Sequence, residues 1–181
     1  MRKLVLATLS ALTLIPFNSV HASTIKDHVK LWKTLDKIGV TSVVNNPVHC
    51  YGAKPQFDGI YFPHSGLLVV CQDNRKLGKG QVKWTENDLD TFRHEAHHVV
   101  QDCAAGSLFD GKSVSMFEKK KLLKFITDAS WSKKEVKNLT KRLEKLGLSE
   151  KEIYMEIEAY VVASSISADA IADKLLEFCK D

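Results

Sequence analysis

A short segment near the middle of the 181-residue chain has the residue types and spacing of a metal-binding helix. It reads His94-Glu95-Ala96-His97-His98 and so contains the pattern His-Glu-x-x-His. On a helix, residues four apart lie on one face, so the imidazoles of His94 and His98 can reach the same zinc ion. The carboxylate of Glu95 lies beside them, where it can take a proton from a water activated by the metal. The pattern predicts a zinc site with Glu95 as the catalytic base.

A catalytic zinc usually takes three protein ligands, so a third acidic or histidine ligand is expected elsewhere in the chain. The metzincin arrangement needs glycine at 101 and histidine at 104, and it is excluded because the chain has Gln101 and Ala104 there. Glu156 is favoured because it lies in an apolar stretch, where a buried carboxylate needs a charge partner or a metal. Glu158 in the same stretch is an alternative. Glu118 is another, since its spacing is thermolysin-like, although three lysines follow it.

The surrounding sequence places the motif in the middle of a helix. Thr85 and Asp88 form a capping-box pattern at its start, and Gly106 is suited to its end. Apolar residues recur between them at helical spacing. Other helices are expected over 24–38, 113–129, 132–146 and 149–178. Short β-prone runs at 43–44, 60–62 and 67–71 predict a small antiparallel sheet, with the last two runs forming a hairpin. The expected fold class is α+β, with this sheet packed on a mainly helical domain.

The first 22 residues have the pattern of a secretory signal peptide. Arg2 and Lys3 precede an apolar run that is too short to span a membrane, and Ala22 ends a segment suited to cleavage. Residues 23–181 then have the length of a single domain. We therefore expect a secreted or periplasmic protein without stable membrane insertion.

All four cysteines follow the expected cleavage site, and their even number in an exported protein predicts two disulfides. Four cysteines allow three pairings. Cys50–Cys71 is favoured because it closes a strand-and-turn region. Cys103–Cys179 is favoured because it would join the motif helix to the C-terminal helix. A structural zinc site of four cysteines is disfavoured, since the sequence has no Cys-x-x-Cys pair.

The charge of the chain argues against a nucleic-acid partner. The formal net charge is +4, and Arg2 and Lys3 in the expected signal peptide contribute two of these charges. So small an excess, without phosphate-binding motifs, is not typical of nucleic-acid-binding domains. The lysine run at 119–121 is expected on a solvated helix face.

The two motifs together resemble those of the gluzincin metallopeptidases. In that family a helical His-Glu-x-x-His is completed by a glutamate on a later helix. The segment Glu156-Ile157-Glu158-Ala159-Tyr160 is similar to the Glu-x-x-Ala-Asp signature of HtpX-like peptidases and their small soluble relatives. Glu156 matches the ligand glutamate and Ala159 the alanine, whereas Tyr160 stands where the signature has aspartate. Residues 59–70 look like the strand that precedes the motif helix in such enzymes.

The resemblance implies a zincin-like domain over 23–181 and a peptidase mechanism. His94, His98 and Glu156 would hold Zn²⁺, and Glu95 would act as general base and pass its proton to the leaving amine. A peptide or protein substrate would add as a strand to the edge of the sheet. Such sites usually include a further donor to the developing oxyanion. Candidates for this role are Tyr160, His97 and His64.

Two other interpretations compete with the peptidase. The first is a non-catalytic metal-binding or protein-interaction module on a zincin-like scaffold. The second is a disulfide-linked helical interaction domain that binds no metal. Substrate, cleavage preference and oligomeric state are not encoded in any pattern found in the sequence.

Overall fold

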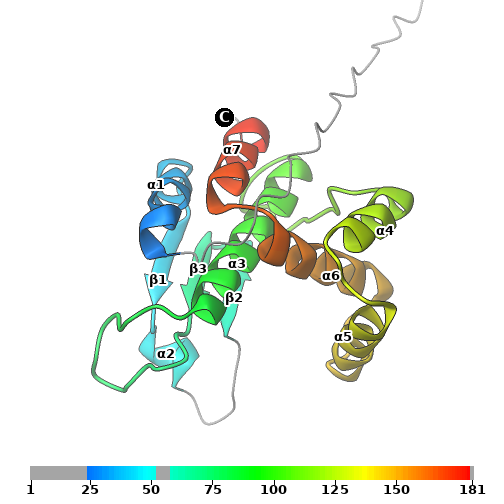
Figure 1. The fold of residues 1–181 in the computed structure, drawn as a ribbon. Helices are drawn as coiled ribbons and strands as arrows, with labels where there is room; N and C mark the ends of the chain where they lie inside the picture. Colours follow the sequence, from blue (N-terminus) through cyan, green and yellow to red (C-terminus); the bar gives the residue numbers. More distant parts are fainter. Residues whose placement is uncertain (1–23, 52–57, 180–181) are drawn as a thin grey trace, which may run out of the picture.

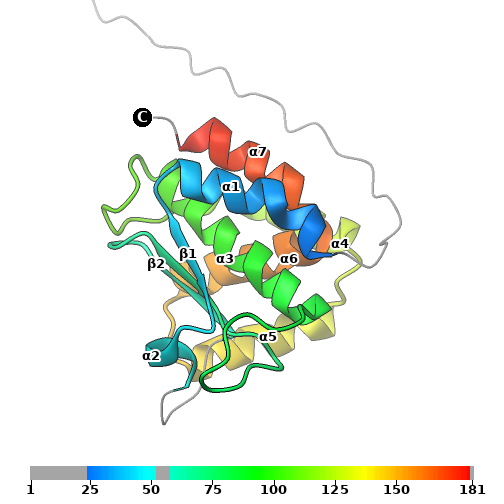
Figure 2. The same ribbon diagram turned by 90° about the vertical axis from the view of Figure 1, so that its left-hand side faces the viewer.

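The fold is organised around one long helix, α3 (Glu86–Ala104), which carries the His-Glu-x-x-His motif. The computed structural model describes residues 24–51 and 58–179, so the expected signal peptide lies outside the described residues. The side chain of Thr85 accepts a hydrogen bond from the backbone N–H of Asp88, and the Asp88 carboxylate accepts one from the N–H of Thr85. This capping box starts α3 as the sequence predicts. The helix runs through the middle of the molecule and is buried along most of its length (Figures 1 and 2).

A three-stranded sheet covers one side of α3. Its strands are β1 (Thr41–Val44), β2 (Gly59–Phe62) and β3 (Leu67–Val70), in the order β1-β3-β2. The predicted hairpin of β2 and β3 is confirmed, with Ile60 opposite Val69. The expectation of an antiparallel sheet is wrong, because β1 pairs with β3 in parallel. The chain forms the two edge strands first, β1 and then β2. Strand β3 follows and pairs with both, which places it in the centre.

Two helical segments from opposite ends of the described chain pack together, and the first of them also contacts β1. The N-terminal segment begins as the 3-10 helix η1 (Ile25–His28) and continues as α1 (Val29–Lys37). It contacts α7 (Ala168–Phe178), which in turn packs against α3 (Figure 2). A single turn, α2 (Pro47–Cys50), connects β1 to the segment before β2.

The remaining helices lie on the other side of α3 from the sheet. Helix α6 (Glu150–Ser165) crosses α3 directly, and α4 (Lys119–Asp128) and α5 (Lys133–Lys145) pack on its outer side (Figure 1). The prediction of one helix over 149–178 is wrong, since the chain becomes extended at Ile166. Ser167 then caps α7 by accepting a hydrogen bond from the N–H of Ala170, so a new helix starts in a new direction.

The predicted helix over 113–129 is also shorter than expected, because α4 begins only at Lys119. Residues 113–118 form an irregular segment that runs back along α3 and α6. Backbone N–H groups of Met116 and Phe117 in this segment donate to the carboxylate of Glu158 on α6. Because these N–H groups donate to the buried carboxylate, they do not form the backbone hydrogen bonds of the helix that was expected over this segment.

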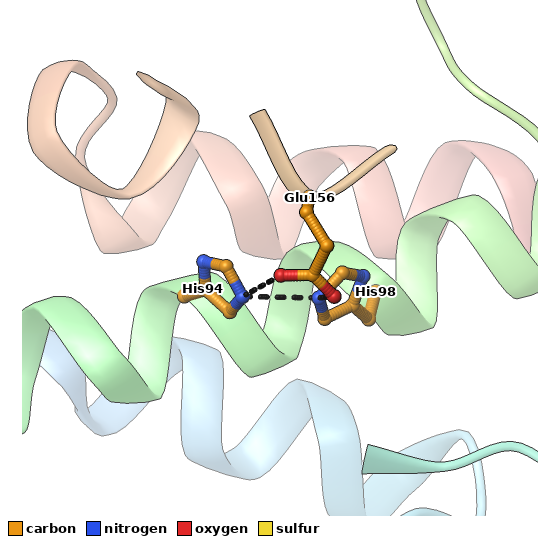
Figure 3. Close-up of side chains that lie close together, drawn as sticks. All are labelled: His94, His98 and Glu156. Carbon is orange, nitrogen blue, oxygen red and sulfur yellow. Dashed lines mark hydrogen bonds and ion pairs between the residues drawn. The ribbon is translucent and has the colours of Figure 1, made fainter. Parts of the chain in front are cut away.

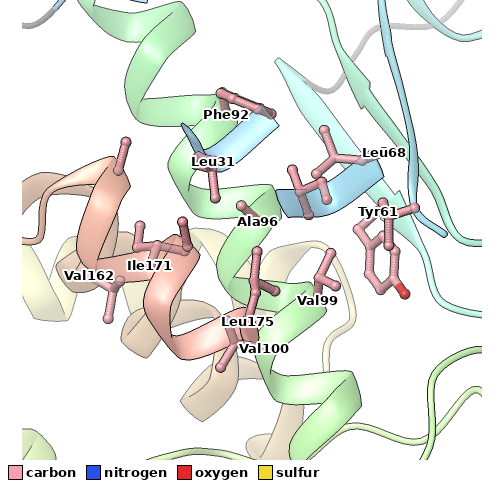
Figure 4. Close-up of a cluster of buried hydrophobic side chains, with 14 of the residues drawn as sticks. Leu31, Tyr61, Leu68, Phe92, Ala96, Val99, Val100, Val162, Ile171 and Leu175 are labelled. Carbon is pink, nitrogen blue, oxygen red and sulfur yellow. The ribbon is translucent and has the colours of Figure 1, made fainter. Parts of the chain in front are cut away.

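The main hydrophobic core lies where α3 meets the sheet, α1 and α7. Phe92 and Ala96 of α3 are fully buried there against Leu31, Leu68 and Leu175 (Figure 4). A second cluster fills the space between α4, α5 and α6. The expected α+β fold class is therefore confirmed, with the motif helix in contact with both the sheet and the helical layer.

Two disulfides close the fold with the pairing that the sequence favours, Cys50–Cys71 and Cys103–Cys179. The first links α2 to the end of β3, and the second links the end of α3 to the residue after α7. Disulfides of this kind indicate an oxidising compartment. Across residues 24–51 and 58–179, no helix has both the length and the apolar character required to cross a membrane.

The longer of the two disulfide-closed loops is expected to contribute more to stability. The paired cysteines are 76 residues apart for Cys103–Cys179 and 21 apart for Cys50–Cys71. Loop-closure entropy then predicts that changing both Cys103 and Cys179 to alanine lowers the free energy of unfolding by about 4 kcal/mol. Changing both Cys50 and Cys71 should lower it by about 3 kcal/mol. Urea unfolding of the two double variants measures both losses. A larger loss for the Cys50–Cys71 pair would contradict this ranking.

Candidate metal centre

Helices α3 and α6 bring His94, His98 and Glu156 together (Figure 3). The two imidazoles lie one turn apart on α3, and the carboxylate reaches them from α6. The Nε2 atom of His94 is 3.3 Å from one oxygen of Glu156, and the Nε2 atom of His98 is 3.3 Å from the other. The two Nε2 atoms are 3.0 Å apart. One ligand atom from each residue lies within 4.8 Å of the others, so the three side chains form a group that could hold a metal ion.

The spacing and chemistry of these atoms fit a tetrahedral ion. Ligand atoms bound at 2.0–2.1 Å in tetrahedral geometry are separated by about 3.3–3.4 Å, close to the distances between these side chains. Two facing Nε2 atoms can share at most one proton between them, whereas an ion satisfies both lone pairs and the carboxylate together. Two imidazoles and a carboxylate are also a common donor set for transition metals.

Among the three glutamates considered as the third ligand, the structure brings Glu156 to the histidines. The capping box of Ser149 and Glu152 sets the start of α6, and Ala159 is fully buried where α6 packs. Glu158 is on a different face of α6 and contacts His97 in place of His94 and His98. Glu118 is exposed and precedes the first residue of α4, outside the group.

Burial and mutual contact set the protonation of the three side chains. Burial lowers the pKa of His94 to about 4. Burial would lower the pKa of His98 as well, but the adjacent Glu156 carboxylate outweighs it and raises this pKa to about 9. Burial would raise the pKa of Glu156, yet the two imidazoles hold it well below its usual range. Glu156 is therefore anionic and His94 neutral near pH 7, and a metal ion would have to displace one proton, from His98.

Glu95 is buried between α3 and β2. A Cβ atom at Gly59 would lie 2.8 Å from Cγ of Glu95 and 2.6 Å from Cγ2 of Thr91, so only glycine allows the strand to approach this closely. The backbone N–H of Tyr61 donates to the Glu95 carboxylate. Burial raises the pKa of Glu95 to about 7, which suits a group that must both accept and release a proton near neutral pH.

The three candidate oxyanion donors occupy different places. The ring of Tyr160 packs against that of His94, with 4.4 Å between centroids, and its hydroxyl accepts a hydrogen bond from Arg142. The ring of His97 is buried and bonds to Glu158 at 2.7 Å. His64 is exposed in the turn between β2 and β3, beside Gly111. Of the three, Tyr160 contacts a residue of the metal-binding group.

A buried polar network beside the group includes residues that the sequence did not indicate. Glu158 is fully buried and accepts hydrogen bonds from Gln101, from Ser115 and from the segment before α4, in addition to its contact with His97. Burial raises the pKa of Glu158, but His97 and the other donors outweigh it and lower the pKa. The sequence signal for Glu158 was its position in an apolar stretch, because a buried carboxylate requires hydrogen-bond donors or a charge partner. Gln101 gave no signal of its own.

Fold and site define this chain as an α+β domain in which two histidines of one helix and a glutamate of a second helix form a candidate metal centre. The chain belongs to the family described as "Domain of unknown function (DUF8637)", whose model matches residues 20–180. No curated protein and no solved structure matches the chain.

Proposed function

We propose that the protein is a zinc-dependent metallopeptidase of the gluzincin type. One observation carries the proposal: a glutamate 58 positions after His98 folds back onto both histidines while Glu95 is buried one residue from His94. This arrangement has the three protein ligands and the adjacent carboxylate that zinc hydrolases use. A helical interaction domain without metal would have no need to bury these groups together.

In this mechanism His94, His98 and Glu156 would hold Zn²⁺. Zinc bound there supplies a Lewis acid that polarises a peptide carbonyl and lowers the pKa of water. Glu95 accepts the proton from the attacking water and later delivers it to the leaving amine. The N–H of Tyr61 orients the Glu95 carboxylate, and the backbone of Gly59 packs closely against the same side chain. The pKa of about 7 allows Glu95 to do both steps near neutral pH.

The free edge of β2 is the proposed binding site for an extended peptide. In the part of the chain that the structure describes, β2 pairs with β3 alone. The N–H of Cys71 bonds to the carbonyl of Asp58, so the backbone groups of alternate residues, Gly59 and Tyr61, point away from β3. The N–H of Tyr61 is used by Glu95, which leaves the carbonyl of Tyr61 and the backbone groups of Gly59 for a substrate strand and places this edge next to the catalytic carboxylate. A substrate strand added here would carry its scissile bond past the metal-binding group.

Tyr160 is expected to contribute to turnover without contributing to metal binding. Burial raises its pKa, and the carboxylates of Glu156 and Glu95 raise it further, so its hydroxyl stays protonated. Because Arg142 donates to the oxygen, the hydroxyl proton is free to donate. Tyr160→Phe should lower kcat about 10²-fold, as loss of one oxyanion donor does, with zinc affinity unchanged. An unchanged kcat would exclude this role.

We also propose that the protein is exported and that residues 1–22 are removed as a signal peptide. The two disulfides support this proposal, because a reducing cytosol would keep these four cysteines as free thiols. N-terminal sequencing of the exported protein should begin at Ser23.

The test of the proposed function is digestion of a peptide library by the purified, disulfide-bonded protein. Cleavage should occur at defined bonds, stop when a metal chelator is added and return when zinc is restored. Zinc binding without cleavage of any peptide would favour the non-catalytic module instead.

A further inference from the structure

The side chain of Gln101 bridges the metal-binding group and the buried network on α6. It lies three residues after His98 on α3 and is fully buried. Its Oε1 atom is 2.8 Å from Nδ1 of His98. Its Nε2 atom donates to the carbonyl of Met155 at 3.1 Å and to the carboxylate of Glu158 at 3.0 Å. One amide thus contacts a candidate metal ligand at one end and α6 at the other.

The orientation of this amide is fixed by its partners on α6. The backbone carbonyl of Met155 can accept hydrogen bonds and cannot donate them. The Glu158 carboxylate also accepts, because the N–H of Met116 lies 3.0 Å from each of its oxygens and the N–H of Phe117 lies 3.1 Å from one of them. With two acceptors facing α6, the NH₂ group of Gln101 must point there. Its carbonyl oxygen must then face His98.

The amide orientation in turn decides which nitrogen of His98 carries a proton. Oε1 of Gln101 can only accept, so the Nδ1 atom of His98 must be the donor. When the ring of His98 is neutral, as a metal ligand must be, the lone pair is therefore on the Nε2 atom, which faces His94 and Glu156. His94 has no equivalent support within the described residues, since its Nδ1 atom is buried without a hydrogen-bond partner.

We propose that Gln101 is a positioning residue that holds the ring of His98 with Nε2 directed at the metal, and that Glu158 and the carbonyl of Met155 hold Gln101 in turn. This inference rests on the metal centre of the proposed function and concerns metal binding, not peptide cleavage. Through Glu158, the same network ties His98 to the segment before α4. Partners of this kind orient a ligand and increase its basicity.

The test compares Gln101→Met with the wild type, with zinc affinity measured by competition against a chromophoric chelator. Methionine keeps the length and burial of the side chain but removes the acceptor for His98. The zinc Kd should rise about 10–100-fold. In NMR spectra of the zinc-loaded wild type, the Nδ1 proton of His98 should be protected from exchange, and in the variant this protection should be lost.

The matched control is Gln72→Met. Gln72 is also fully buried, and its amide makes hydrogen bonds to Asn45 and to the backbone of Val82, none of which contacts the metal-binding group. Loss of stability is expected in both variants, whereas the change in zinc Kd is expected at position 101 alone. Should Gln101→Met fail to fold, Gln101→Asn keeps a polar amide that is one methylene too short to span both partners. It should show the same loss of affinity.

An equal zinc Kd for wild type and both position-101 variants, with the Nδ1 proton still protected, would overturn the positioning role. Equal losses at positions 72 and 101 would also overturn it, because the effect would then follow stability. If the wild type binds zinc and the affinity ratio is as expected but no peptide is cleaved, the peptidase proposal fails and the role of Gln101 stands. A wild type that binds no zinc overturns both.

Discussion

Replacing Glu95 with glutamine is expected to lower the rate of peptide hydrolysis by about 10²–10⁴-fold, the usual contribution of a general acid–base group. The amide of glutamine fills the same space beneath Gly59 but cannot take a proton from water. Zinc affinity should stay at the wild-type value, because Glu95 is not one of the three residues whose ligand atoms converge. Initial rates on a peptide identified from the library, together with zinc content, measure both effects.

Glu86→Gln is the matched control for this variant. Glu86 lies in the first turn of the same helix, where its side chain is exposed, two turns before His94. The control should hydrolyse the peptide at the wild-type rate. Full activity in Glu95→Gln would contradict the assigned mechanism, whereas loss of zinc from that variant would show that Glu95 belongs to the metal-binding group.

Replacing Glu156 with alanine is expected to weaken zinc binding by more than about 10²-fold. The loss should exceed the 10–100-fold typical of a residue that merely supports a ligand, because a ligand atom itself is removed. The variant also leaves the imidazoles of His94 and His98 without the carboxylate that faces both. Competition with a chromophoric chelator gives the zinc Kd, and peptide hydrolysis at submicromolar free zinc should fall in parallel.

Glu118→Ala is the comparison for Glu156→Ala. Glu118 has the spacing of a thermolysin-type ligand, but in the structure it is exposed at the start of α4. Its replacement should leave the zinc Kd unchanged. Loss of zinc from Glu118→Ala, with normal zinc binding in Glu156→Ala, would show that Glu118 and not Glu156 is the third ligand.

The part of the fold that local signals specify could be predicted from the sequence. Thr85 and Asp88 mark the start of α3, and Ser132 with Glu135 and Ser149 with Glu152 mark the starts of α5 and α6. These boxes are satisfied by residues three positions apart, so no tertiary information is needed. The two disulfide pairings were also predicted, the first because it closes a strand-and-turn region and the second because it joins the motif helix to the C-terminal helix.

Features that depend on distant parts of the chain were predicted less well. The parallel pairing joins β1 to β3, a strand more than twenty residues later in the chain, and strand periodicity carries no information about strand direction. The break at Ile166 was missed because the apolar pattern continues through it. Ser167 was nevertheless a visible cap residue.

The candidate site shows the same division. His94, Glu95 and His98 are evident from spacing within one helix, and Glu156 was favoured because its carboxylate lies in an apolar stretch. Gln101 was not identified, since a glutamine on a helix face has many ordinary roles. Its role depends on acceptors contributed by α6, and these become apparent when the two helices are placed side by side.

Zinc content of the purified wild type and of His98→Ala tests the central claim most directly. The account predicts one zinc ion per wild-type chain, measured by elemental mass spectrometry after dialysis against metal-free buffer, and none in the variant, since the imidazole that completes the group is removed. A wild-type chain without metal, or a variant that retains the same zinc content, would contradict the assignment of a metal centre to His94, His98 and Glu156.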